Sequence, residues 1–335
     1  MANRAVARNL ITDVAGIRVG HADDARLGSG ATVVIFDQPA VAAADLRGGG
    51  PGTRESALLD PAMTVERIDA IVLSGGSAFG LDAASGAQAW LREQGRGFLV
   101  RTVRVPIVPA AILFDLLNGG DKGWGRYPPY RELGHQAAEC AAADFALGSV
   151  GAGYGATTAD LKGGIGSASA TTPGSIRVGA LAAVNAAGSA VIGGGPHFWA
   201  GVCERDGEYG GRGLPASVAP QALSYRAKGQ PGENTTLVVV ATDATLTKAQ
   251  TRRLAIMAQD GLARALRPVH TPLDGDIVFA AATCAGPVPD PTHGLAEIGT
   301  LAADVVARAI ARGIYEARAL AFPGAQPSWR DRFGG

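Results

Sequence analysis

One run of β-forming residues, Leu237–Thr242 (LVVVAT), constrains the fold of this chain most. The run does not alternate apolar with polar side chains, so it predicts a strand that is covered on both faces. Thr247 and Gln250 follow it with the spacing of a capping box. The apolar stripe after them predicts a helix that ends before Pro268. We therefore expect sheet and helix to be packed in layers.

The same alternation of strand-like runs and helical patterns covers most of the 335 residues. The 48 glycines, about twice the usual share, predict many close backbone approaches. Residues 104–109 contain two prolines and are expected to form a loop or an edge. Residues 202–234 are interpreted as a linker or a processing segment, and 323–335 as a mobile tail. Further strands are predicted at 32–36, 70–73, 177–185, 189–192 and 276–283, and further helices at 81–93, 132–145 and 295–318.

Charge and cysteine content exclude several classes of protein. Lys+Arg and Asp+Glu both number 30, so the basic surface of a nucleic-acid-binding protein is not expected. The N-terminus lacks the apolar core of a signal peptide, and no apolar run is long enough to span a membrane. The three cysteines lie far apart without a CxxC motif, which predicts buried free thiols in a reducing compartment. We therefore expect a cytoplasmic protein without a nucleic-acid or membrane partner.

Several familiar catalytic motifs are incomplete. The sequence at 75–80 (GGSAFG) has Phe79 where a nucleophile elbow needs glycine, which favours a tight strand-to-helix turn at Ser77. The glycines at 151–155 do not fit a phosphate loop, and the five histidines form no zinc motif. Asp274 and Asp276 alone do not specify a metal. No metal and no organic cofactor is expected.

The tripeptide Asn234-Thr235-Thr236 directly precedes the buried strand and has two interpretations. Asn favours turns and Thr favours strand starts, so the tripeptide can be purely structural. If the Asn234–Thr235 bond is cut, however, Thr235 carries both a hydroxyl and an α-amino group. That amine, with a pKa near 7.7–8.0, can accept the hydroxyl proton at neutral pH. The second interpretation needs no histidine.

Six blocks of sequence, in order between about residues 11 and 318, resemble one enzyme family. They are ITDVAGIRVGHADD, DLRGGGPGTRES, AIVLSGGSAFGLDAASG, VPIVPAAILFD, VGAGYGATTADLKGGIGSAS and ENTTLVVVATDATLTKAQ. The family, peptidase family S58, comprises self-cleaving L-aminopeptidase/D-amidase and β-aminopeptidase enzymes and nylon-oligomer (6-aminohexanoate oligomer) hydrolases. The resemblance implies an α+β fold, a layered αββα sandwich with helices outside two packed sheets, shared with ornithine acetyltransferases. It also implies one catalytic domain cleaved into an α polypeptide (1–234) and a β polypeptide (235–335).

The resemblance also implies roles for individual residues. Thr235 after Asn234 matches the threonine nucleophile of the nylon-oligomer branch, where the aminopeptidase branch has serine. Lys162 matches that branch's active-site lysine, and Asn185 its oxyanion-side asparagine, whose amide can donate two hydrogen bonds. Asp274 and Asp276 match the paired active-site carboxylates of the nylon-oligomer branch. Asp276 is expected to bind the new ammonium of Thr235, while Asp274 orients Asp276, the hydroxyl or the substrate amine.

Phe114 lies where the characterised nylon-oligomer enzyme has an active-site tyrosine, so a hydrogen-bond donor is missing there. The resemblance implies a hydrolase of small amides through an acyl-enzyme on Thr235, with a preference for 6-aminohexanoate oligomers over β-peptides or short peptides. An L-aminopeptidase/D-esterase, an acyltransferase of the ornithine acetyltransferase type and a non-catalytic oligomeric binding protein remain alternatives. We expect a homo-oligomer of αβ units.

Overall fold

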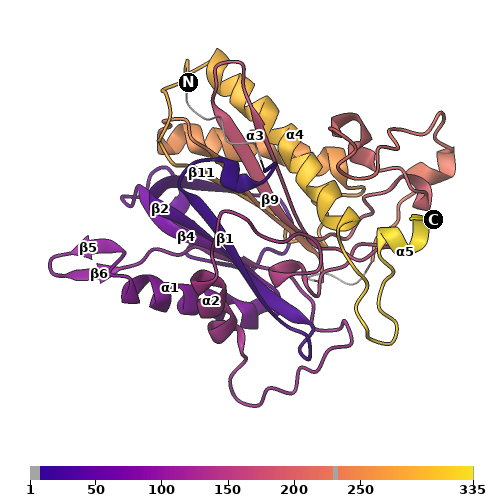
Figure 1. The fold of residues 1–335 in the computed structure, drawn as a ribbon, viewed down its shortest axis with the longest axis horizontal. Helices are drawn as coiled ribbons and strands as arrows, with labels where there is room; N and C mark the ends of the chain where they lie inside the picture. The colour runs from indigo at the N-terminus through magenta and orange to yellow at the C-terminus, as the bar shows by residue number, and fades with distance from the viewer. Residues whose placement is uncertain (1–7, 229–232, 335) are drawn as a thin grey trace.

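The computed structural model describes residues 8–228 and 233–334, which form a mixed sheet flanked by helices (Figure 1). Helices α1 (Ala83–Glu93) and α2 (Tyr130–Glu139) cover one face. Helices α3 (Lys248–Ala265) and α4 (His293–Tyr315) cover the opposite side of the molecule. The predicted α+β class is confirmed.

A single nine-stranded sheet is built around the long strand β2 (Ser29–Leu46). The register of β2 against β4 shifts between Ile35 and Ala40, next to Pro39. The first half of β2 pairs with β1 and β4, and its second half with β11. Along the sheet the order is β3 (Thr53–Arg54), β7 (Ala110–Ile112), β4 (Arg67–Ser74), β2, β11 (Ile277–Ala282), β10 (Thr235–Thr242), β9 (Arg177–Asn185) and β8 (Ile165–Thr171), with β1 (Ile17–Asp24) beside β2.

Three apolar clusters show how this sheet folds upon itself. The first joins Val72 of β4 to α1 and α2, and the third joins Val240 of β10 to α3 and α4. The second contains Phe36 and Leu73 from one half of the sheet together with Phe279 from the other, and no helix α1–α4 contributes to it. The layers therefore run helices, half-sheet, half-sheet, helices. Two separate sheets were expected, but the halves are hydrogen-bonded into one because β2 crosses both.

Most predicted elements are present, with shifted ends. The capping box of Thr247 and Gln250 is confirmed at the start of α3. The strand predicted at 189–192 is wrong, since only isolated bridges occur there, and α2 ends at Glu139 rather than near 145. Strands β5 (Phe98–Val100) and β6 (Val103–Val105) form a separate hairpin. Short 3₁₀ helices connect these elements: η1 (Ile11–Asp13), η2 (Ser56–Leu59), η3 (Ser77–Asp82), η4 (Gly151–Gly153), η5 (Ile192–Gly194), η6 (Trp199–Cys203) and η7 (Pro220–Leu223).

The described part of the predicted mobile tail, 323–334, contains the short helix α5 (Trp329–Phe333). Ser328 and Asp331 cap this helix reciprocally, and Trp329 is only 3% exposed. The sequence reading overlooked Trp329 as an anchor. Of the segment 202–234, residues 229–232 lie outside the described residues, as does residue 335 of the tail.

The structure bears on the expectations about the cysteines and about membrane-spanning segments. The thiols are free, but the prediction that they are buried is wrong: Cys140 is exposed because it follows the last turn of α2 at the surface, and Cys203 and Cys284 are half-buried. Within residues 8–228 and 233–334, no helix is long and apolar enough to cross a membrane.

Candidate active site

Three adjacent strands bring four of the predicted site residues to one end of β10. Thr235, the first residue of β10, lies directly opposite Asn185, the last residue of β9. On the other side, Asn234 forms an isolated parallel bridge with Asp274, just before β11. Thr235 is 3% exposed, and its neighbours in this cluster are at most 1% exposed. The register of the sheet therefore gathers residues that are far apart in the sequence.

The peptide group between Asn234 and Thr235 is polarised from two sides. The Thr235 hydroxyl donates to the carbonyl oxygen of Asn234, so this hydroxyl lies against the peptide group that precedes it. The backbone N–H of Gly275 donates to the same oxygen at 2.8 Å. A Cβ on Gly275 would lie 2.6 Å from Thr235 Oγ1, so only glycine allows this approach. The sequence indicated Asp274 and Asp276 but not the donor between them.

The two predicted carboxylates are held by different partners. Asp276 accepts hydrogen bonds from the Thr236 N–H at 2.7 Å and from His270 Nδ1 at 2.9 Å. Asp274 accepts from the Ala187 N–H at 3.0 Å and from the Thr271 hydroxyl at 2.6 Å. Burial, and after it the charge of Asp276, raises the pKa of Asp274. The hydrogen bonds found for these carboxylates do not reach the Thr235 hydroxyl, and the sequence did not indicate His270 as a partner of Asp276.

Asn185 is fixed in one orientation by bonds to both ends of its amide. Its Oδ1 accepts from the Thr157 N–H and from Lys228 Nζ, each at 3.0 Å. Its Nδ2 therefore points the other way and donates to the carbonyl oxygens of Phe114 at 3.0 Å and Glu233 at 3.1 Å. In the uncut chain, one of its N–H groups thus binds the backbone two residues before Thr235.

Lys162 is buried in a cage of backbone carbonyl groups. Its Nζ donates to the carbonyl oxygens of Gly153, Ala156 and Gly163 at 2.7–2.9 Å, which uses all three ammonium hydrogens. Burial lowers the pKa of Lys162 to about 7, with the charge of Asp115 opposing the shift. The protonated Lys162 therefore has no N–H left on Nζ to donate to a ligand.

A second lysine in the site, the half-buried Lys228, was missed by the sequence reading. Its Nζ donates to the carbonyl and hydroxyl oxygens of Thr157, both at 2.6 Å, and to Asn185. Its backbone carbonyl accepts from the Asn234 side chain at 3.1 Å. Burial lowers its pKa to about 7. Nothing in the stretch RAKGQPGEN separates this lysine from an ordinary exposed one, because its partners come from distant loops.

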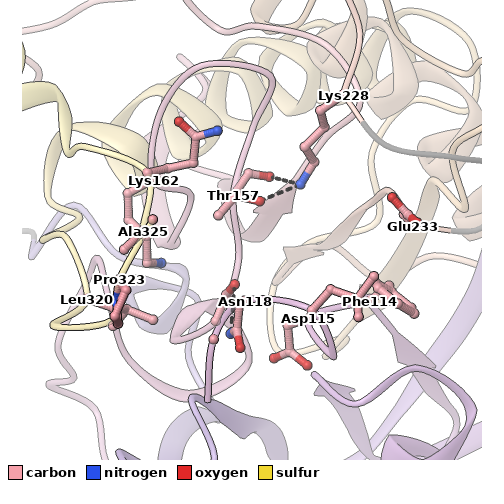
Figure 2. Close-up of a pocket in the computed structure, with 15 residues that line it drawn as sticks. Phe114, Asp115, Asn118, Thr157, Lys162, Lys228, Glu233, Leu320, Pro323 and Ala325 are labelled. Atoms are coloured by element: carbon pink, nitrogen blue, oxygen red, sulfur yellow. Dashed lines mark hydrogen bonds between the residues drawn. The ribbon is translucent and has the colours of Figure 1, made fainter.

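A cavity of about 330 Å³ lies beside this cluster (Figure 2). Its charged lining comprises Asp115, Lys162, Lys228 and Glu233, and Phe114 adds an apolar ring. Asp115 accepts from the Ser29 hydroxyl at 2.6 Å and the Gly76 N–H at 2.8 Å, and burial raises its pKa. Thr235 does not line the cavity, but Glu233 does. Glu233, which precedes the Asn234–Thr235 bond, thus connects the cavity lining to the buried Thr235.

Among residues 8–228 and 233–334, no group of three or more His, Cys, Asp or Glu side chains is arranged so that it could hold a metal ion. Ser77 lies with φ +52° at the tight turn between β4 and η3, as its structural interpretation predicts.

Comparison with known proteins identifies the family. The family model described as Peptidase family S58 matches residues 9–326. The chain belongs to this family. The family S58 match spans Asn185, Thr235 and the Asp274–Asp276 turn, so the whole cluster at the end of β10 lies inside the matched region.

Relatives of this S58 chain are found at two levels of similarity. An uncharacterized aminopeptidase of Mycobacterium tuberculosis is 45% identical, over 98% of each chain. A 6-aminohexanoate-oligomer endohydrolase of Kocuria is 27% identical, over 81% of this chain and 74% of that protein. The solved structure of an L-aminopeptidase D-Ala-esterase/amidase from Ochrobactrum anthropi superposes with a TM-score of 0.67 at 22% identity, covering 93% and 87% of the chains, which supports the Ntn-hydrolase type of fold.

These comparisons shift the expected substrate. The sequence reading placed 6-aminohexanoate oligomers first, from Thr235 and the pair of aspartates. The oligomer hydrolase is only a distant relative, whereas the 45% identical protein carries an aminopeptidase name. The alternative of an aminopeptidase is therefore better supported than the nylon-oligomer reading. The distant fold similarity alone does not distinguish substrates.

Proposed function

We propose that this S58 hydrolase cuts itself between Asn234 and Thr235 and then releases the N-terminal residue from short peptides and amino-acid amides. One observation carries the proposal: the Thr235 hydroxyl and the Gly275 N–H both bind the Asn234 carbonyl oxygen. A nucleophile and an oxyanion donor are thus in place at a single peptide bond.

The self-cleavage follows from this arrangement. Thr235 Oγ attacks the Asn234 carbonyl carbon, and the negative charge on the oxygen is stabilised by the Gly275 N–H. The C–N bond breaks, the hydroxyl proton passes to the departing Thr235 nitrogen, and an ester links Asn234 to Thr235 Oγ. Water hydrolyses the ester into the Asn234 carboxylate and a free N-terminal Thr235.

Substrate hydrolysis then uses the same groups. The Thr235 amine accepts the hydroxyl proton while Oγ attacks the substrate carbonyl. The leaving amine departs with a proton, and water releases the acid from the acyl-enzyme. Asp276, already bonded to the Thr236 N–H, is placed next to the new ammonium. Departure of Glu233 and Asn234 from these contacts after cleavage frees the Asn185 amide from the Glu233 carbonyl, so Asn185 and Gly275 supply two oxyanion donors.

An aminopeptidase also needs a group that recognises the free amine of its substrate. The buried Asp115 carboxylate lines the cavity and accepts hydrogen bonds from two neutral donors, the Ser29 hydroxyl and the Gly76 N–H. It can therefore accept from a substrate ammonium. Phe114 cannot supply the hydroxyl that the active-site tyrosine of the nylon-oligomer enzyme supplies. This difference favours aminoacyl substrates over 6-aminohexanoate oligomers.

The test is an intact-mass spectrum of the purified protein followed by assays. Two fragments are expected, one starting at Thr235, with masses that add up to the precursor plus one water. Thr235→Ala should remain a single inactive chain, and Thr235→Ser should keep part of both reactions. L-alanine p-nitroanilide, β-alanine p-nitroanilide and a linear 6-aminohexanoate oligomer are compared as substrates. Fragments with another N-terminus, or full activity in an uncut chain, would refute the mechanism, and activity confined to the oligomer would refute the aminopeptidase.

A further inference from the structure

The C-terminal segment of the chain forms one wall of the cavity. After α4 ends, five residues from Leu320 to Gln326 belong to the lining: Leu320, Pro323, Gly324, Ala325 and Gln326. In Figure 2, Leu320, Pro323 and Ala325 lie on one side of the cavity, while Phe114 and Glu233 lie on the other. We call residues 320–326 the C-terminal strap.

The strap is anchored on both sides of the cavity. At one side the ring of Phe322 lies so close to Gly28 that a Cβ there would be 2.7 Å from Phe322 Cε2. Gly119, which also lines the cavity, is in similar contact with Phe322. At the other side, the Lys162 N–H donates to the Pro327 carbonyl oxygen at 2.8 Å. The strap therefore cannot swing outward without breaking contacts at both ends.

Helix α5 strengthens the second anchor. Trp329 stacks on Phe198 with ring centroids 5.8 Å apart, and its Nε1 donates to the Pro196 carbonyl oxygen at 3.2 Å. The match to the family ends at residue 326, so α5 lies beyond it. Trp329 thus holds the strap from outside the part of the chain that the family model matches.

The strap differs in chemistry from the rest of the cavity lining. The strap contributes apolar or uncharged groups, whereas Asp115, Lys162, Lys228 and Glu233 are ionisable. A volume of about 330 Å³ is at the small end of the range for ligand pockets. Such a cavity matches a compact substrate with a charged amine at one end and a small apolar remainder at the other.

We propose that the C-terminal strap is a specificity element that restricts the enzyme to short substrates, such as dipeptides and amino-acid amides with small apolar side chains, and excludes longer oligomers. This role rests on the proposed function, because it assumes that the cavity receives the substrate. The strap touches the bound substrate on the side away from the oxyanion donors. It selects by shape and takes no part in bond making.

Two matched substitutions on the strap test the proposal. Ala325→Trp places a large ring in the cavity, whereas Ala321→Trp adds the same ring on an exposed position that does not line it. We expect Ala325→Trp to raise KM for dialanine at least about tenfold with a smaller change in kcat, and Ala321→Trp to stay within about twofold of wild type. Intact-mass spectra report self-cleavage of each variant separately.

A chain that ends at Gln326 keeps the strap but lacks the Pro327 and Trp329 anchors. The ratio of kcat/KM for tetra-alanine to that for dialanine should rise about tenfold or more in this chain. The strap's role alone would be overturned by three results together. The wild type is active, the kcat/KM ratio is unchanged in the shortened chain, and Ala325→Trp and Ala321→Trp have equal effects. An inactive wild type would overturn the proposed function. If the shortened chain does not fold, the comparison of Ala325→Trp with Ala321→Trp decides.

Discussion

At the scale of single residues, the candidate site depends on where hydrogen-bond donors point. Asn185 could donate in either of two directions, and Thr157 and Lys228 select one by binding its oxygen. Gly275 contributes only a backbone N–H, but that N–H binds the carbonyl oxygen of the bond proposed to break. Lys228 and Gly275 both help to set this geometry. Their residue types alone give no reason to expect them in the site.

Replacing Asn185 by Ala should lower amide turnover about 10²–10³-fold, the usual cost of losing one oxyanion donor. The residue is buried at the end of β9, so far-UV circular dichroism is measured alongside kcat/KM. Turnover close to that of wild type would remove Asn185 from the oxyanion role.

Replacing Gly275 by Ala should slow self-cleavage about 10²-fold, because its Cβ would displace the Thr235 hydroxyl from the Asn234 carbonyl. Time courses of intact mass after purification measure the rate. Gly174→Ala is the control, since a Cβ there would meet nothing closer than 3.7 Å. Equal cleavage rates in both variants would contradict the proposed geometry.

At the scale of elements, glycines let the backbones of neighbouring helices approach each other closely. A Cβ on Gly86 of α1 would lie 1.8 Å from the Arg131 carbonyl oxygen of α2. A Cβ on Gly134 of α2 would lie 1.9 Å from the Ala83 carbonyl oxygen of α1. The glycine-rich composition predicted close approaches of this kind, and the packing of α1 against α2 confirms them.

Replacing Gly86 by Ala should destabilise the fold by about 1–3 kcal/mol through overpacking. Helix propensity alone would predict the opposite, a gain of about 1 kcal/mol from Gly to Ala. Urea unfolding measures the change, with the exposed Arg92→Ala on the same helix as control. A stabilised Gly86→Ala variant would show that the two helices can move apart without cost.

At the scale of the whole molecule, the two polypeptides expected from cleavage are interleaved. Strand β10 lies between β9 of the α part and β11 of the β part, and β11 in turn pairs with β2 of the α part. Helix α4 packs on β8 and β9. Separating the parts would expose the central apolar clusters, so the fold holds both together without the Asn234–Thr235 bond.

Buried lysines should also make the stability of the whole protein depend on pH. Burial lowers the pKa of Lys162 and Lys228 from 10.5 to about 7. Between pH 7 and 10.5 the unfolded chain then binds more protons than the folded chain, so the free energy of unfolding rises with pH in this window. The expected gain is about 1 kcal/mol per pH unit for each lysine.

Urea unfolding of the uncut Thr235→Ala chain at pH 7, 8 and 9 measures this slope. Adding Lys162→Met should lower stability, since three carbonyl groups lose their donor, and should also flatten the slope. A slope unchanged by Lys162→Met would mean that Lys162 stays protonated in the folded state over this range.

Local sequence determined the elements whose periodicity is strong. The run Leu237–Thr242 became β10, the capping box of Thr247 began α3, and the range 177–185 became β9. These predictions succeeded because apolar periodicity and capping depend on neighbouring residues. The resemblance of six blocks also led to the family and to Thr235, which the structure places at the start of β10.

Only the tertiary structure decided which of these residues meet and what surrounds them. Asn185 faces Thr235 because β9 pairs with β10 in one register, and a strand's sequence does not name its partner. Lys228 reaches Asn185, and the strap reaches the cavity, across long stretches of chain. The contacts of Trp329 with Phe198 and Pro196 fix the C-terminal segment beside the cavity, although its sequence shows no strong pattern. Hydrogen-bond partners and burial arise from contacts between distant segments, so no local pattern in the sequence records them.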